Sequence, residues 1–168
     1  MRRHRKPGQQ RGFSLIESMT AITLSGLLFA SGVPLTSSWV SSARVRDAQG
    51  LMTQGVARAR ALALRNPGGV TGTATAAMLC LSGGNLRLIA ASRSPQTAAS
   101  CSATAALWSA RLPASASVTA GGSALGCLAF NNRGVAVNPA AASGSDSCPT
   151  STSVVIASSS QNVALTLY

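Results

Sequence analysis

The sequence predicts an α+β protein in which a long N-terminal helix, first transmembrane and then amphipathic, packs on a small, mostly antiparallel β-sheet domain. Three observations predict this class. A basic N-terminus precedes a long apolar stretch, helical periodicity continues to Arg65, and short apolar runs separated by turn residues fill the rest of the chain. A length of 168 residues corresponds to one domain with an appendage.

Residues 1–12 are expected to form a basic leader peptide. Five of the 14 basic residues lie in the first eleven positions, at Arg2, Arg3, Arg5, Lys6 and Arg11. The rest of the chain then holds nine basic and three acidic residues, a net charge near +6. Part of the extreme pI of about 11.7 therefore reflects targeting and is no direct measure of nucleic-acid affinity.

Residues 13–42 are expected to be the transmembrane half of the helix. Glu17 is the one charged residue between Gly12 and Ala43, and about 20 apolar helical residues suffice to cross a bilayer. The basic flank before this stretch predicts that the N-terminus stays in the cytoplasm, so the β domain would lie on the other side of the membrane. The alternative is a secretory signal peptide, which has a shorter apolar core and then a small-residue cleavage site.

Residues 43–66 are expected to continue the helix as an amphipathic periplasmic half. Apolar and small residues recur at helical spacing at Val45, Ala48, Met52, Val56, Ala59 and Ala63. The run from Asn66 to Gly69 (NPGG) should end the helix. Pro34 should kink it, because proline lacks an N–H and its ring clashes with the preceding turn.

Residues 67–168 are expected to form a β-rich globular domain. Apolar runs predict strands near Thr73–Leu81, Leu86–Ala91, Ala105–Leu112, Ser117–Ala120, Leu125–Asn131, Val135–Asn138, Ser153–Ser158 and Val163–Tyr168. Turns are expected at Gly83–Asn85, Asn131–Gly134 and Ser158–Gln161, and surface loops at Pro95–Ser100 and Pro139–Thr150.

All four cysteines lie in the β-rich part, and four cysteines allow three pairings. Outside the cytoplasm, disulfides would stabilise a small core that has few aromatic residues. The pairs Cys80–Cys101 and Cys127–Cys148 are favoured because each fastens a long loop to the strand before it. A metal site is the alternative, but the chain has no C-x-x-C spacing and no nearby histidine.

The chain has few of the carboxylate and imidazole side chains that enzyme active sites use. Glu17, Asp47 and Asp146 are the only carboxylates, and His4 is the only imidazole. Paired-carboxylate hydrolysis, Ser-His-Asp chemistry and zinc sites with histidine ligands need more of these groups. We therefore expect no enzyme activity, no cofactor and no metal.

The segment from Arg11 to Glu17 (RGFSLIE), with the basic leader before it and the apolar helix after it, resembles the N-terminal methylation signal of type IV prepilins and type II secretion pseudopilins. The resemblance implies that prepilin peptidase cleaves between Gly12 and Phe13 and that the Phe13 amine is then N-methylated. Glu17 and Pro34 match the family's glutamate and proline. Glu17 would then set subunit register in a filament, by pairing with the N-terminal amine of a neighbouring subunit.

Two further stretches are similar to the GspH/FimT family of minor pilins and H-type pseudopilins: residues 57–66 (ARARALALRN) and 127–135 (CLAFNNRGV). The similarity implies a minor pilin that helps to initiate or cap a type IV pilus. Its partners would be other pilin or pseudopilin subunits, prepilin peptidase and the bacterial inner membrane. An H-class subunit of the type II secretion pseudopilus is the alternative.

A pilus-tip DNA receptor for natural transformation is a further alternative. DNA-binding relatives resembling FimT carry a Gly-Arg-x-Arg motif near the C-terminus, whereas residues 160–165 here read SQNVAL. DNA contacts would then depend on Arg87, Arg93, Arg111 and Arg133, which are scattered in the sequence. DNA binding is therefore possible but not favoured.

Overall fold

The computed structural model describes residues 14–139, 148–150, 153–159 and 161–166, and for residues 31–36 it describes the backbone alone. The chain divides into two compact units, Met1–Ser37 and Ser38–Tyr168. A long helix, α1 (Leu15–Arg65), is followed by antiparallel sheets, which confirms the predicted α+β class. The predicted boundary at residues 42 and 43 stays a prediction.

Helix α1 ends where the sequence contains its helix-breaking run. Asn66 has a positive φ of 44°, the left-handed conformation that commonly follows a helix. Its side chain closes the turn, since Nδ2 donates to the carbonyl of Val70 at 2.8 Å and Oδ1 accepts the Val70 N–H at 3.0 Å. The helical backbone continues through Pro34, whose side chain lies outside the described residues.

Three sheets follow the helix. The largest, called the larger sheet below, has five strands in the order β5-β2-β1-β8-β9. They are β1 (Ala77–Ser82), β2 (Asn85–Ala90), β5 (Trp108–Arg111), β8 (Cys127–Phe130) and β9 (Ala136–Val137). The second has the order β11-β10-β6-β7 and contains β6 (Ser117–Ala120), β7 (Ser123–Ala124), β10 (Ser153–Ser158) and β11 (Gln161–Thr166). Strands β3 (Ser92–Arg93) and β4 (Gln96–Thr97) form a small hairpin.

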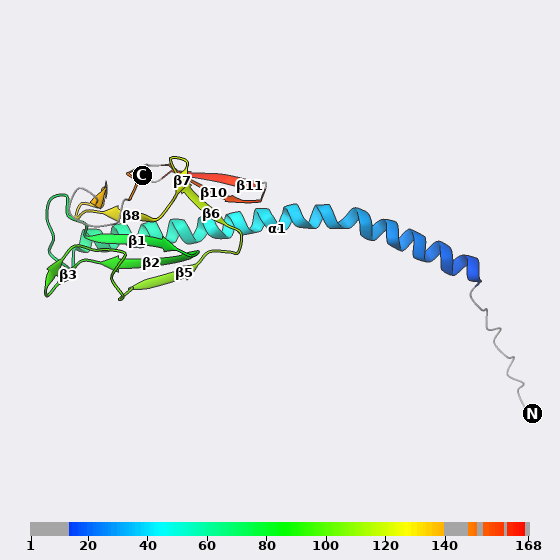
Figure 1. Cartoon of the computed structure of the whole chain (residues 1–168), viewed down its shortest axis with the longest axis horizontal. Coiled ribbons are helices and arrows are strands. Elements are labelled where there is room, and N and C mark those ends of the chain that lie inside the picture. Colours follow the sequence, from blue (N-terminus) through cyan, green and yellow to red (C-terminus); the bar gives the residue numbers. More distant parts are fainter. Residues whose placement is uncertain (1–13, 140–147, 151–152, 160, 167–168) are drawn as a thin grey trace, which may run out of the picture. The chain divides into compact units, whose positions relative to one another are not determined.

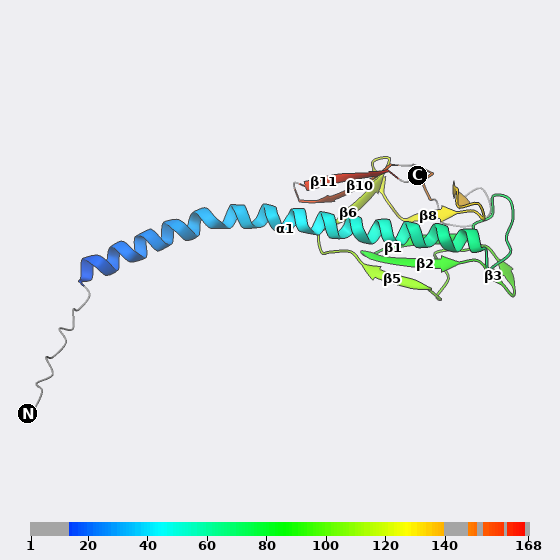
Figure 2. The same cartoon turned by 180° about the vertical axis from the view of Figure 1, so that it is seen from behind.

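Residues 38–65 of α1 pack against one face of both larger sheets. In Figure 1 the five-stranded sheet lies in front of the helix, and from behind, in Figure 2, the helix lies in front of the sheet. The apolar positions predicted on the helix are all buried, and they share one core with Leu79, Leu128 and Phe130 of the larger sheet and Ile156 of the smaller one. One helix face therefore holds the two sheets together.

Several predicted strand limits were wrong. The strand predicted from Thr73 begins only at Ala77, because Gly72 has a φ of 69° and the Ala74 N–H bonds to the Thr71 carbonyl in a turn. The strand predicted from Ala105 begins at Trp108. The predicted loop Pro95–Ser100 contains β4, whose Gln96 amide donates to the Gly69 carbonyl at 2.9 Å. The sequence analysis also missed β7.

Gly68 lies where the chain leaves the helix and passes close to Ala91. A Cβ at Gly68 would lie 2.5 Å from the Ala91 Cβ and 2.8 Å from its carbonyl carbon. We expect Gly68→Ala to lower the free energy of unfolding by roughly 1–3 kcal/mol, the usual cost of overpacking.

Gly50 provides a matched control inside α1, since no atom beyond its chain neighbours and the adjacent helix backbone lies within 4 Å of its Cβ position. Gly50→Ala should raise the free energy of unfolding by about 0.5–1 kcal/mol, because alanine loses less backbone entropy in a helix. Urea unfolding of the two variants measures both effects. A Gly68→Ala protein as stable as the wild type would contradict the close approach to Ala91.

Candidate functional site

Glu17 lies in the first turn of α1, the helix end that favours a negative charge. Its side chain is exposed, and within the described part of the chain no side chain is bonded to its carboxylate. Its backbone N–H bonds to the Ser14 carbonyl at 3.0 Å. Gly12 and Phe13, the predicted processing residues, lie outside the described residues. The Glu17 side chain thus lies exposed near the start of the described helix.

The helix of the first unit has an exposed apolar surface. Between Leu15 and Phe29 the exposed large apolar side chains have exposed fractions from 61% at Met19 to 81% at Leu15. The hydroxyls of Thr23 and Ser25 donate to carbonyls of their own helix at 2.9 and 2.7 Å, a pattern that satisfies hydroxyls without water. Among the described residues, no helix is both long enough and apolar enough to cross a membrane.

The face of the larger sheet that points away from α1 carries both disulfides. The bonds join Cys80 to Cys101 and Cys127 to Cys148, with Cα–Cα distances of 5.7 and 5.0 Å. These are the two pairs that the sequence analysis favoured. Cys80 of β1 and Cys127 of β8 are register partners, so their side chains lie next to each other on this face.

The disulfides fasten two loops over this face. Beneath the loops lies a second, smaller core that contains Met78, Cys80, Ile89, Ala99, Cys127, Ala129 and Cys148. Strands β1 and β8 are thus largely buried on both faces, by the helix on one side and by the segments around Cys101 and Cys148 on the other. The two cross-links stabilise a small core in a chain that has few aromatic residues.

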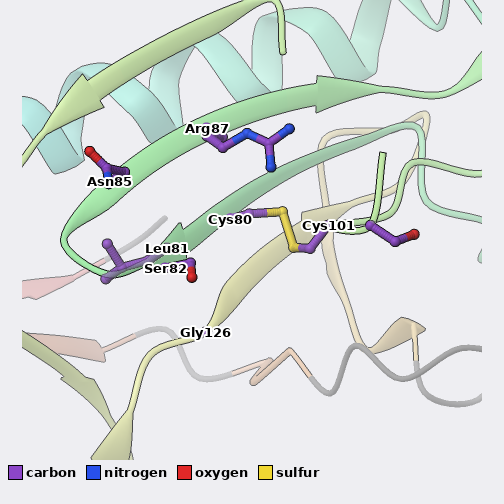
Figure 3. Close-up of a pocket in the computed structure, with 8 residues that line it drawn as sticks. Cys80, Leu81, Ser82, Asn85, Arg87, Cys101 and Gly126 are labelled. Atoms are coloured by element: carbon purple, nitrogen blue, oxygen red, sulfur yellow. A yellow bond between two sulfur atoms is a disulfide. The ribbon is translucent and has the colours of Figure 1, made fainter. Parts of the chain in front are cut away.

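A cleft of about 300 Å³ opens beside the Cys80–Cys101 disulfide, with Asn85 and Arg87 on its wall (Figure 3). The Arg87 Nη2 donates to the carbonyls of Ala103 and Thr104, at 2.6 and 3.0 Å. The guanidinium therefore holds the loop after Cys101 against β2. Arg87 is half-buried, and these bonds account for its position.

The four arginines considered for DNA lie in different places. Arg111 pairs with Asn85 at the start of β2, and Arg93 lies in β3, beyond the other end of β2. A strand of this length spans roughly 17–20 Å. Arg133 lies in the turn before Gly134, whose Cβ position is 3.6 Å from the Leu64 side chain. Arg87 pairs with Ser109, so Arg87 and Arg111 are diagonal neighbours on one face of β2 and β5. Arg93 and Arg133 do not join them in one patch, and the DNA role of the four stays a prediction.

Comparison with known proteins bears on the N-terminal segment. Residues 8–33 match the prokaryotic N-terminal methylation motif. The match supports a type IV pilin-like protein. The matched residues include Gly12, Phe13 and Glu17, and a motif of this kind points to a structural subunit and not to an enzyme family. No curated protein and no solved structure matches the chain.

The pilin-like motif ends at residue 33, so it leaves the β domain and the membership of the GspH/FimT family untested. The arrangement of one long helix and antiparallel sheets is consistent with a pilin-like fold. Sequence reasoning missed Trp39 and Arg46, which lie exposed where the helix enters the second unit. The available signal was their position at the end of the apolar stretch.

Proposed function

We propose that this chain is a minor pilin or pseudopilin, a structural subunit that helps to initiate or cap a type IV pilus. The observation that carries the proposal is the methylation motif at residues 8–33. The long helix and the β unit that follows it are consistent with the proposal. The scarcity of carboxylate and imidazole groups is also consistent with a role in assembly.

The proposed mechanism begins with processing of the leader. Prepilin peptidase cleaves between Gly12 and Phe13, and the new Phe13 amine is N-methylated. In the filament, the Glu17 carboxylate pairs with the N-terminal amine of a neighbouring subunit. This pairing sets the axial register, because an unpaired charge in an apolar surrounding is strongly unfavourable.

The exposed apolar half of α1 is proposed to serve two environments. Before assembly it anchors the chain in the bacterial inner membrane, with the N-terminus in the cytoplasm and the β domain in the periplasm. In the filament it packs against the helices of other subunits. Both environments cover the apolar side chains between Leu15 and Phe29.

A subunit of the type II secretion pseudopilus, of the H class, is the alternative proposal, since the same motif and processing serve both systems. A tip-exposed DNA receptor is less supported. Of its four arginines only Arg87 and Arg111 are neighbours, and Arg87 already bonds to two carbonyls of its own chain.

Intact mass tests the proposal. Protein recovered from membranes that contain prepilin peptidase should have a mass that begins at N-methylated Phe13, and protein from membranes without the peptidase should keep residues 1–12. Reduction should reveal four thiols in both samples, because the cysteines lie outside the leader. A full-length mass in the presence of active peptidase, or cleavage beyond the apolar stretch, contradicts the pilin assignment.

A further inference from the structure

The segment of α1 that enters the second unit combines an exposed indole with cations. Trp39 is 72% exposed, and Val40 beside it is 37% exposed. Arg44 and Arg46 follow on the same helix, and both are exposed. We propose that Trp39 and an arginine collar, defined as Arg44, Arg46 and Arg111, seat this end of the unit on the membrane interface. The collar would bind the phosphates of anionic phospholipids.

One hydrogen bond links Arg44 to the loop after Arg111, and Arg46 lies two residues from Arg44 on the helix. The Arg44 Nη1 donates to Ser115 Oγ at 3.2 Å, and Ser115 and Arg111 line one cleft of about 460 Å³. Arg46 lines a second cleft, of about 140 Å³, with Gln161 and Asn162 at the turn between β10 and β11. Cations from the helix and from β5 therefore share one end of the unit.

The charge at this end is positive. Asp47, one turn from Arg44, is the only carboxylate among the residues that the structure describes from 38 onward. Three guanidinium groups against one carboxylate leave a net charge of +2 on these side chains. Guanidinium forks match the geometry of phosphate oxygens, so anionic headgroups are the complementary partner.

The indole identifies the partner as a bilayer. Tryptophan is enriched where hydrocarbon meets headgroups, because its ring is apolar and its N–H is polar. Trp39 lies at the end of the apolar stretch, and the collar begins five residues later. A symmetric contact with a second copy of this chain is a poorer alternative, since it would set the collar of one copy against the like charge of the other. The inference rests on the proposed membrane anchoring.

The experiment uses the full chain in vesicles of phosphatidylethanolamine with phosphatidylglycerol or with phosphatidylcholine. A Trp108→Phe variant leaves Trp39 as its single indole, and a Trp39→Phe variant leaves Trp108. Lipids brominated near the headgroup should quench Trp39 more strongly than deeply brominated lipids do, and neither should quench Trp108. Trp108 is a suitable control because it packs on the helix at Gly55, 3.2 Å from the Cβ position there.

Quenching by brominated phosphatidylglycerol against brominated phosphatidylcholine gives a relative association constant at Trp39. Each arginine should contribute up to about fivefold to this constant, and high salt should lower it. The double variant Arg44→Gln/Arg46→Gln should lower the constant by up to about 25-fold and leave only the contribution of Arg111. The matched double variant Arg93→Gln/Arg133→Gln removes the same charge elsewhere and should leave the constant unchanged.

The outcomes separate this inference from the proposed function. If the chain is not retained in vesicles at all, the membrane anchoring itself fails. If it is retained but Trp39 is unquenched, the indole is not at the interface and the inference is wrong. Equal loss of lipid preference in both double variants would show that net charge, and not the collar, selects the lipid, which also overturns the inference.

Discussion

A Glu17→Gln variant is expected to be processed and inserted in the membrane but to be lost from filaments by at least roughly a hundredfold. The amide keeps the size of the side chain and removes its charge. In a filament the N-terminal amine of the neighbouring subunit would then lie in apolar surroundings without a counter-ion, which is strongly unfavourable. The measurement compares the abundance of the subunit in sheared filaments with its abundance in membranes.

Asp47 offers the matched control for the Glu17 variant. It lies on the same helix, is exposed, and loses the same charge as Asp47→Asn. This variant should enter filaments like the wild type, and Glu17→Asp should retain part of the incorporation. Normal incorporation of Glu17→Gln would contradict the register role, and an equal loss in Asp47→Asn would attribute the effect to the charge of the helix as a whole.

Removal of a disulfide is expected to have the largest effect on stability. Each bond links residues 21 positions apart, and loops of about this length correspond to about 3 kcal/mol in the free energy of unfolding. We expect Cys127→Ala/Cys148→Ala to lose more than Cys80→Ala/Cys101→Ala. Cys127 and Cys148 are both buried, whereas Cys101 is only half-buried, so the first pair also leaves a larger cavity.

The cysteines must be replaced in pairs. Cys80 and Cys127 are register partners, so a lone thiol at either position would lie beside the other disulfide and could exchange with it. Urea unfolding under oxidising conditions measures the stability, and peptide mapping without reduction measures the pairing. Cross-linked peptides that join Cys80 to Cys127 would contradict the arrangement, as would a paired variant as stable as the wild type.

Much of the helix was predictable because its signals are local. The apolar positions from Val45 to Ala63 repeat at helical spacing, and all of them are buried. The end at Arg65 follows from Asn66, which tolerates a positive φ, and from the Pro-Gly-Gly run after it. Such signals depend on neighbouring residues, so they can be interpreted without knowledge of the fold.

The limits of the strands were less predictable because tertiary contacts set them. The residues before Trp108 have apolar character, but the loop after Cys101 is held by a disulfide and by Arg87. Strand β4 is held in position by its pairing with β3 and by the hydrogen bond from the Gln96 side chain to the Gly69 carbonyl. None of these partners is adjacent in sequence, and propensity alone does not include them.

The sequence by itself determined that a methylation motif and a long, largely apolar helix lead into a basic β unit with four cysteines and few groups suited to catalysis. Only the tertiary structure decided that Cys80 and Cys127 lie side by side, that Arg87 and Arg111 are neighbours while Arg93 and Arg133 lie elsewhere, and that Arg44 bonds to Ser115 in the loop after Arg111. The physical reason is that strand register and helix packing bring together residues that are far apart along the chain. Burial of apolar side chains drives this packing, and because burial is not specific to particular residues, the sequence pattern alone does not show which residues meet.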